Sequence, residues 1–191
     1  FFICLLVFPS LVGIVVLAPI LVRVVPRYNQ WIPALIPLLF ISIEFVFSAA
    51  TTQLTNMLNA IGKIRITFYL MIMWTVMAWI FIPVLAVKFG VTGAAIGYSL
   101  VSASSIIAIL IAKKYVNFSI TDSMIKPLIG AFVMGFFLII MKRFLPISVN
   151  SMILLTLAGV AIYSASMLSM MGLSLVADVK KSFKTLMNRA S

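Results

Sequence analysis

Long apolar stretches alternate with short polar breaks along the whole chain. Most of these stretches reach the length of about 20 residues that a helix needs to cross the roughly 30 Å hydrocarbon core of a bilayer. Because a backbone inside lipid must pair its own N–H and C=O groups, each stretch is interpreted as a helix. Six crossings are predicted: Phe1–Val22, Ile32–Ala60, Ile66–Val87, Gly93–Ala112, Leu128–Met141 and Met152–Val176.

The breaks carry the signals of membrane boundaries. The first, "RVVPRYNQW", combines two arginines and a proline with Tyr28 and Trp31, side chains that favour the membrane interface. The later breaks read "GKIR", "KFGVTG", "KKYVNFSITDSMIK" and "KRFLPISVN". Their short length predicts antiparallel neighbouring helices.

Composition supports the same class. Hydrophobic residues make up 64% of the 191 positions, against about 45 to 50% in soluble domains. Charged residues make up only 9%, and the mean hydropathy is +1.29. The predicted fold class is therefore an all-α integral membrane protein.

The charge pattern predicts an orientation. The net charge is +11, but the basic residues stand at the ends of apolar stretches, which indicates topology rather than nucleic-acid binding. The first, third and fifth breaks hold five: Arg23, Arg27, Lys88, Lys142 and Arg143. The other two breaks and the tail hold nine: Lys63, Arg65, Lys113, Lys114, Lys126, Lys180, Lys181, Lys184 and Arg189. The side with more cations is expected to be cytoplasmic, which places the C-terminus in the cytoplasm.

Few residues are available for catalysis or metal binding. The chain has no histidine, and its only acidic residues are Glu44, Asp122 and Asp178. A histidine-based triad or a protein metal site therefore lacks its ligands, and we expect a protein that is not an enzyme. The first residues, "FFICLLVFPS", include no methionine and no basic signal region, so the chain is expected to be the later part of a longer polypeptide.

One polar stripe interrupts the apolar pattern, in "EFVFSAATTQLTNMLNAIGK" at residues 44–63. At 100° per residue its members fall within one arc about 100° wide on a helix. They are Glu44, Ser48, Thr51, Thr52, Thr55 and Asn59. The other faces of this helix are mainly apolar.

The depth of Glu44 in the bilayer indicates what the stripe does. Glu44 follows Trp31 by 13 residues, which is about 20 Å of helix and well inside a bilayer. A charge there costs about 2.5 to 3.5 kcal/mol, and such residues generally face a bundle interior or a wet cavity. The stripe therefore predicts a substrate or ion pathway. A packing role is the alternative, with hydroxyls bonded to their own helix backbone and Glu44 paired with a neighbouring helix.

A weaker polar face lies on the fourth predicted helix. Tyr98, Ser102 and Ser105 follow i, i+4, i+7 spacing and would form the opposite wall of the same cavity. The nearby "GAAIG", Gly93 to Gly97, is a small-xxx-small pattern that permits close backbone approach, and we interpret it as packing.

Two segments carry a resemblance to a known family. "YNQWIPALIPLL" and "TNMLNAIGKIRITFYLMIMWTVMAWIFIPVLAVKFGVTGAAIGYSLVSASS" resemble the C-terminal part of polysaccharide biosynthesis flippases, including O-antigen flippases. These belong to the multidrug/oligosaccharidyl-lipid/polysaccharide exporter superfamily. The landmarks are a tyrosine opening a helix, the "LNAIGK" helix end, and "FGVTGAAIG" opening the next-but-one helix.

The resemblance implies a fourteen-helix transporter with two six-helix lobes and two added helices. Residues 1–114 would supply four helices of the C-terminal lobe, 115–176 the added pair, and 177–191 a basic cytoplasmic tail. The implied activity is flipping of a polyprenyl-linked oligosaccharide across a prokaryotic plasma membrane by alternating access. No cofactor is implied beyond a coupling H⁺ or Na⁺, and the implied partners are the bilayer and the N-terminal helices of the same polypeptide.

Two other functions fit the same sequence. A multidrug or small-solute exporter of this fold would share the polar stripe. A non-catalytic membrane subunit that scaffolds partners would need the stripe only for packing. An integral-membrane glycosyltransferase is disfavoured because the acidic catalytic loop residues are absent.

Overall fold

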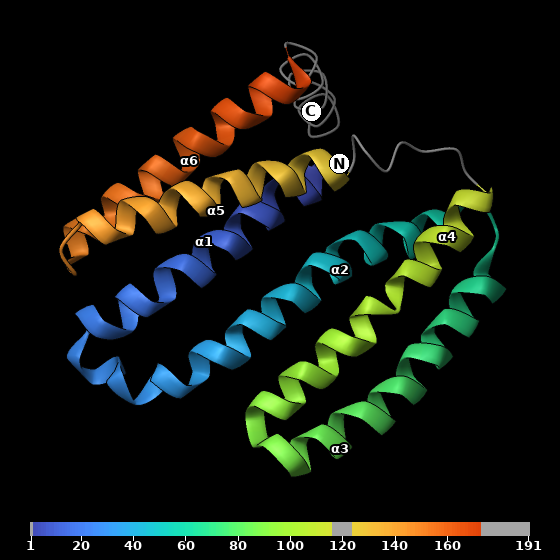
Figure 1. Cartoon of the computed structure of the whole chain (residues 1–191). Coiled ribbons are helices and arrows are strands. Elements are labelled where there is room, and N and C mark those ends of the chain that lie inside the picture. The colour runs from blue at the N-terminus through green and yellow to red at the C-terminus, as the bar shows by residue number, and fades with distance from the viewer. Residues whose placement is uncertain (1, 116–123, 173–191) are drawn as a thin grey trace, which may run out of the picture.

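The protein is described by a computed structural model that covers residues 2–115 and 124–172. Within these ranges all regular elements are helices, which confirms the all-α prediction for this part of the chain (Figure 1). In chain order they are α1 (Phe2–Val24), the 3-10 helix η1 (Pro26–Ala34), α2 (Leu35–Ala60), α3 (Ile64–Ala103), α4 (Ser105–Tyr115), α5 (Lys126–Phe144) and α6 (Val149–Met171).

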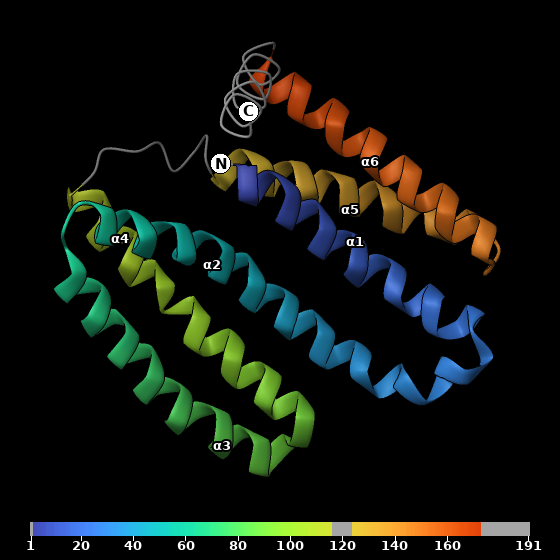
Figure 2. The same cartoon turned by 180° about the vertical axis from the view of Figure 1, so that it is seen from behind.

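Five helical segments in the described ranges are long and apolar enough to cross a membrane, where the sequence predicted six crossings. The predicted third and fourth crossings lie together in one segment, Ile64–Tyr115. At 52 residues it is more than twice the length of about 20 residues that one crossing needs. Its chain reverses direction at Gly90, so that two arms lie side by side (Figures 1 and 2).

The reversal occupies less of the chain than the sequence predicted. Instead of a loop over "KFGVTG", helical structure continues on both sides, and Gly90 alone has a non-helical backbone, with φ 61° and ψ −141°. Glycine reaches this region at little cost because it has no Cβ. One residue therefore provides the turn.

Close contact between the two arms depends on glycine. A Cβ on Gly97 would lie 2.9 Å from Cα of Ile82, and one on Gly93 would collide with the backbone carbonyl of Leu85. Both glycines are buried. The structure therefore confirms the interpretation of Gly93 to Gly97 as a packing motif.

Helix ends follow local sequence signals. After α2, Gly62 has φ 77°, and the N–H of Lys63 donates to the carbonyl of Leu58 at 2.8 Å, which forms a Schellman cap. Helix α5 ends before Pro146, which disfavours helix at the residue that precedes it. Helix α6 starts at Val149, after the N-cap residue Ser148, whose side chain accepts a hydrogen bond from the Ser151 N–H at 3.2 Å.

The helices form two groups that meet where α1 contacts α2 (Figures 1 and 2). Helices α1, α5 and α6 pack around a core that includes Phe8, Leu138 and Leu155. Helices α2, α3 and α4 share a smaller core of Leu58, Leu70 and Ala108. Large apolar side chains cover much of the outer surface, as is expected where helices face lipid.

The cations of the described helices separate to the two ends of the molecule. The η1 turn, the Gly90 reversal and the α5–α6 turn lie at one end, with Arg23, Arg27, Lys88, Lys142 and Arg143 (Figure 1). The opposite end holds Lys63, Arg65, Lys113, Lys114 and Lys126. This arrangement matches the alternation that the sequence predicted, whereas the side of the membrane stays a prediction. The predicted basic tail, 177–191, lies outside the described residues.

Candidate functional site

The predicted polar stripe lies entirely on α2 and straddles the edge of its packed face. Thr51 and Thr55 are buried, with 7% and 8% of their surface exposed. Glu44 and Ser48 are half-buried, whereas Thr52 is exposed. Asn59, near the C-terminal end of α2, is also exposed. The stripe thus turns partly toward neighbouring helices and partly outward.

The threonine hydroxyls of the stripe donate to carbonyls of their own helix. Thr51 Oγ1 donates to the Phe47 carbonyl at 2.7 Å, and Thr52 Oγ1 to the Ser48 carbonyl at 2.9 Å. Thr55 Oγ1 donates to the Thr52 carbonyl at 3.0 Å. Such bonds satisfy a hydroxyl donor inside an apolar medium without any partner on another helix. These three hydrogen bonds within one helix are the ones that a packing role of the stripe predicts.

Glu44 behaves differently from the threonines. Its carboxylate makes no hydrogen bond and no ion pair with any residue of 2–115 or 124–172. The packing interpretation required a partner on a neighbouring helix, and within the described chain Glu44 has none. It is also the only acidic residue in these ranges. No hydrogen bond or ion pair within the described chain therefore accounts for the half-buried position of this carboxylate on α2.

The second predicted polar face is divided between two helices. Ser102 and Ser105 are buried, whereas Tyr98 is 51% exposed. Helix α3 ends before Ser104 and α4 begins after it, so the predicted single helical face is interrupted. The Ser104 hydroxyl donates to the Val101 carbonyl at 2.6 Å. Serine hydroxyls compete with backbone N–H groups for carbonyls in this way, which favours a local break.

A contact that the sequence did not predict joins the two helices that carry the polar faces. Ser99 Oγ donates to the Phe40 carbonyl of α2 at 2.6 Å. Phe40 lies one helical turn before Glu44, so the second arm of α3 packs against α2 close to the carboxylate. Ser99 lies outside the i, i+4, i+7 face of Tyr98, and periodicity alone gave no reason to select it.

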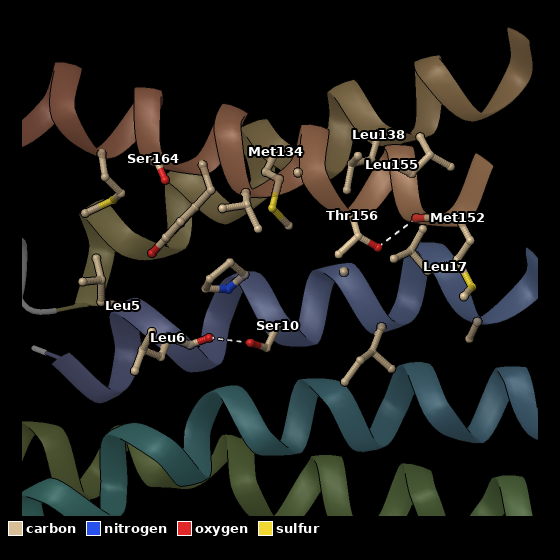
Figure 3. Close-up of a pocket in the computed structure, with 18 of the residues that line it drawn as sticks. Leu5, Leu6, Ser10, Leu17, Met134, Leu138, Met152, Leu155, Thr156 and Ser164 are labelled. Atoms are coloured by element: carbon tan, nitrogen blue, oxygen red, sulfur yellow. Dashed lines mark hydrogen bonds between the residues drawn. The ribbon is translucent and has the colours of Figure 1, made fainter. Parts of the chain in front are cut away.

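Two cavities lie elsewhere, and no stripe residue lines either of them. The larger, of about 820 Å³, lies between α1 and α6, with Met134 and Leu138 of α5 also in its lining (Figure 3). The smaller, of about 480 Å³, contains Arg23, Lys142 and Arg143. Sequence reasoning used these three cations only as topology signals, because nothing in their spacing along the chain indicated that they meet.

The polar groups on α2 and α3 can bind a polar solute or a cation. Among the residues that the structure describes, no three His, Cys, Asp or Glu side chains gather as metal ligands. Hydroxyl, amide and carboxylate groups on facing helices can exchange hydrogen bonds with a polar solute, and a carboxylate can take up a proton or hold a cation.

Comparisons of the chain with protein-family models, curated proteins and solved structures found no match. The functional proposal therefore rests on the residues of α2 and α3 and on the resemblance of the sequence segments described above.

Proposed function

We propose that the chain is part of a membrane transporter that flips a polyprenyl-linked oligosaccharide by alternating access. The observation that carries the proposal is the carboxylate of Glu44, which is half-buried in the apolar helix α2 and has no partner among the described residues. A charge at that depth costs about 2.5 to 3.5 kcal/mol, and intramembrane carboxylates generally mark ion or substrate pathways. The side chains of Ser48, Thr52 and Asn59, none of them fully buried, would continue the pathway along α2.

The chemistry of the substrate fits such a pathway. An oligosaccharide carries many hydroxyls, and each would lose free energy if it crossed hydrocarbon without a hydrogen-bond partner. Its polyprenyl tail can stay in lipid while the sugars pass along polar side chains. A carboxylate would repel the substrate phosphate, so the role proposed for Glu44 is ion coupling or contact with sugar hydroxyls.

Coupling would supply the driving force. One charge that moves across the membrane potential yields about 2.3 kcal/mol per 100 mV. Protonation of Glu44, or Na⁺ bound to it, would remove the uncompensated charge in one conformation and restore it in the other. The coupling ion would therefore bias the equilibrium between the two states.

The proposal includes a topology. Two crossings would lie within Ile64–Tyr115, with Gly90 near one membrane surface, which gives six crossings in total. The chain would supply the last part of a fourteen-helix transporter in a prokaryotic plasma membrane, with a cytoplasmic C-terminus. The remaining helices would come from the same polypeptide.

A non-catalytic scaffold is the second candidate. It is favoured by the threonines Thr51, Thr52 and Thr55, whose hydroxyls bond their own helix as packing groups do. A scaffold predicts no functional role for the carboxylate of Glu44, so one substitution separates the two candidates.

The test is Glu44→Gln in cells that depend on the protein for export of surface polysaccharide. Glutamine keeps the size and polarity of the side chain and removes its charge and its titratable proton. We expect polymer export to fall at least about tenfold, which corresponds to about 1.4 kcal/mol. Gln53→Leu, on an exposed position outside the stripe, is the control and should leave export unchanged.

Export by Glu44→Gln at the wild-type rate, with equal amounts of protein in the membrane, would contradict the transporter proposal and favour the scaffold. Uptake measurements in vesicles then distinguish the two substrate classes. Uptake of lipid-linked oligosaccharide supports flipping, whereas uptake of an organic cation alone identifies a small-solute exporter of the same fold.

A further inference from the structure

A long apolar groove runs along the surface between α1 and α6. Its volume of about 820 Å³ lies within the roughly 300 to 1,000 Å³ of typical small-molecule sites. Its lining on α1 extends from Leu5 to Leu21, which is about 24 Å at 1.5 Å per residue. Figure 3 shows side chains from α1, α5 and α6 that point into it, among them Leu6, Leu17 and Leu138.

The groove is open along its length. Leu6 and Val160, on its two walls, are 69% and 62% exposed. Gly13 also lines the groove, and a Cβ added there would meet no atom within 4 Å. The groove therefore has room for an apolar chain that comes from outside the described helices.

A basic pocket of about 480 Å³ adjoins one end of this groove, and Leu155 lines both cavities. The pocket is lined by Arg23 at the end of α1 and by Lys142 and Arg143 at the end of α5. Lys142 Nζ donates to the Val16 carbonyl at 3.3 Å rather than to a carboxylate.

The charges in the basic pocket have no counter-charge among the described residues. Arg23 and Lys142 line the same pocket, so two positive charges face it. The one acidic residue in these ranges, Glu44, stands on α2 and does not line the pocket. Ser151, in the first turn of α6, adds a hydroxyl to the lining, and a helix N-terminus favours anions. Three uncompensated cations therefore favour a bound anion.

We propose that the groove and the basic pocket together bind one anionic phospholipid as a resident ligand. The phosphate would lie among Arg23, Lys142 and Arg143, where charged N–H donors meet phosphate oxygens. One acyl chain would follow the groove from Leu155 toward Gly13. A phospholipid is the occupant that combines an anion with an attached apolar chain, and the two cavities adjoin in that order. This site is separate from the pathway on α2.

The test counts lipid bound to the purified full chain in detergent micelles by native mass spectrometry. Phosphatidylglycerol and phosphatidylcholine with the same acyl chains are the two probes, because they differ in net charge. Wild type should retain phosphatidylglycerol about tenfold more than phosphatidylcholine, because cations near a lipid headgroup attract the net negative charge that only phosphatidylglycerol carries. Equal retention of both lipids would overturn the proposal.

Substitutions in the basic pocket test the headgroup site. Arg23→Gln and Lys142→Gln should each lower retained phosphatidylglycerol several-fold, and Lys142→Arg should restore it. The matched control is Arg27→Gln, an exposed cation at the same end of the molecule that does not line the pocket. Equal loss in the control would mean a diffuse charge effect and would contradict a defined site.

Substitutions in the groove test the chain site. Gly13→Leu should fill the groove and reduce lipid retention, whereas Ala161→Leu, exposed on α6 outside the lining, should not. Unchanged retention in Gly13→Leu, with an unchanged melting temperature, would overturn the groove assignment. Glu44→Gln should leave lipid retention unaltered, so failure of this proposal and failure of the transport proposal are distinguishable.

Discussion

Glu44 and the threonines beside it belong to one stripe in the sequence but differ in the structure. Each of Thr51, Thr52 and Thr55 has a carbonyl of its own helix as acceptor, whereas Glu44 has no hydrogen-bond or ion-pair partner in the described chain. Helical periodicity placed these side chains on one arc but could not show their acceptors. The difference makes the carboxylate, rather than the hydroxyls, the residue on which the transport hypothesis depends.

Glycine contacts give a prediction at the same scale. Gly93→Ala would place a methyl group against the Leu85 carbonyl and should destabilise the protein by about 1 to 3 kcal/mol, as overpacking does. Gly13→Ala is the control, because its methyl group would enter open space. It should stabilise α1 by about 0.5 to 1 kcal/mol, since glycine is costly within a helix. Unfolding of the purified variants by denaturant measures both, and equal effects would contradict the packing role of Gly93.

Among the elements, the helices were predictable and some of their limits were not. Apolar length identified every long helix, and "LNAIGK" ends α2 as its glycine suggested. The reversal at Gly90 was expected to take a loop. The small residues Gly93 and Gly97 predicted close packing, but the sequence did not show that their partner is the preceding arm of the same chain segment. The break at Ser104 was missed because no glycine or proline stands near it in the sequence.

The two arms of α3 give a prediction about topology. Each variant carries a single cysteine in a Cys4→Ala background. Lys88→Cys should be labelled from the same membrane face as Arg27→Cys, because both residues lie at the same end of the molecule (Figure 1). Lys63→Cys should react from the opposite face. An impermeant thiol reagent, applied to oriented vesicles, measures this. If Lys88→Cys reacts from the face of Lys63→Cys, Ile64–Tyr115 does not cross the membrane twice.

In the whole molecule, the association of helices lay beyond sequence reasoning. All the long helices are apolar on most faces, so periodicity could not show that α1 packs with α5 and α6 as well as with α2. The basic pocket is a consequence of this packing, since it joins Arg23 to Lys142 across two helices far apart in the chain. The hydrogen bond between Ser99 and Phe40 likewise depends on the packing of α3 against α2, which periodicity does not show. The segregation of cations to two ends was predictable because it follows from helix order alone.

The central claim is that the stripe on α2 borders water, and thiol accessibility measures it most directly. In a Cys4→Ala background, Ser48→Cys and Thr52→Cys are treated in intact membranes with a small water-soluble thiol reagent. The control is Ile43→Cys, 42% exposed and at nearly the depth of Glu44 but on another face of α2. We expect the stripe positions to react at least about tenfold faster, as residues beside a water-filled cavity would. If both positions stay as unreactive as Ile43→Cys, with and without lipid-linked oligosaccharide, the stripe does not border water and the transport pathway is contradicted.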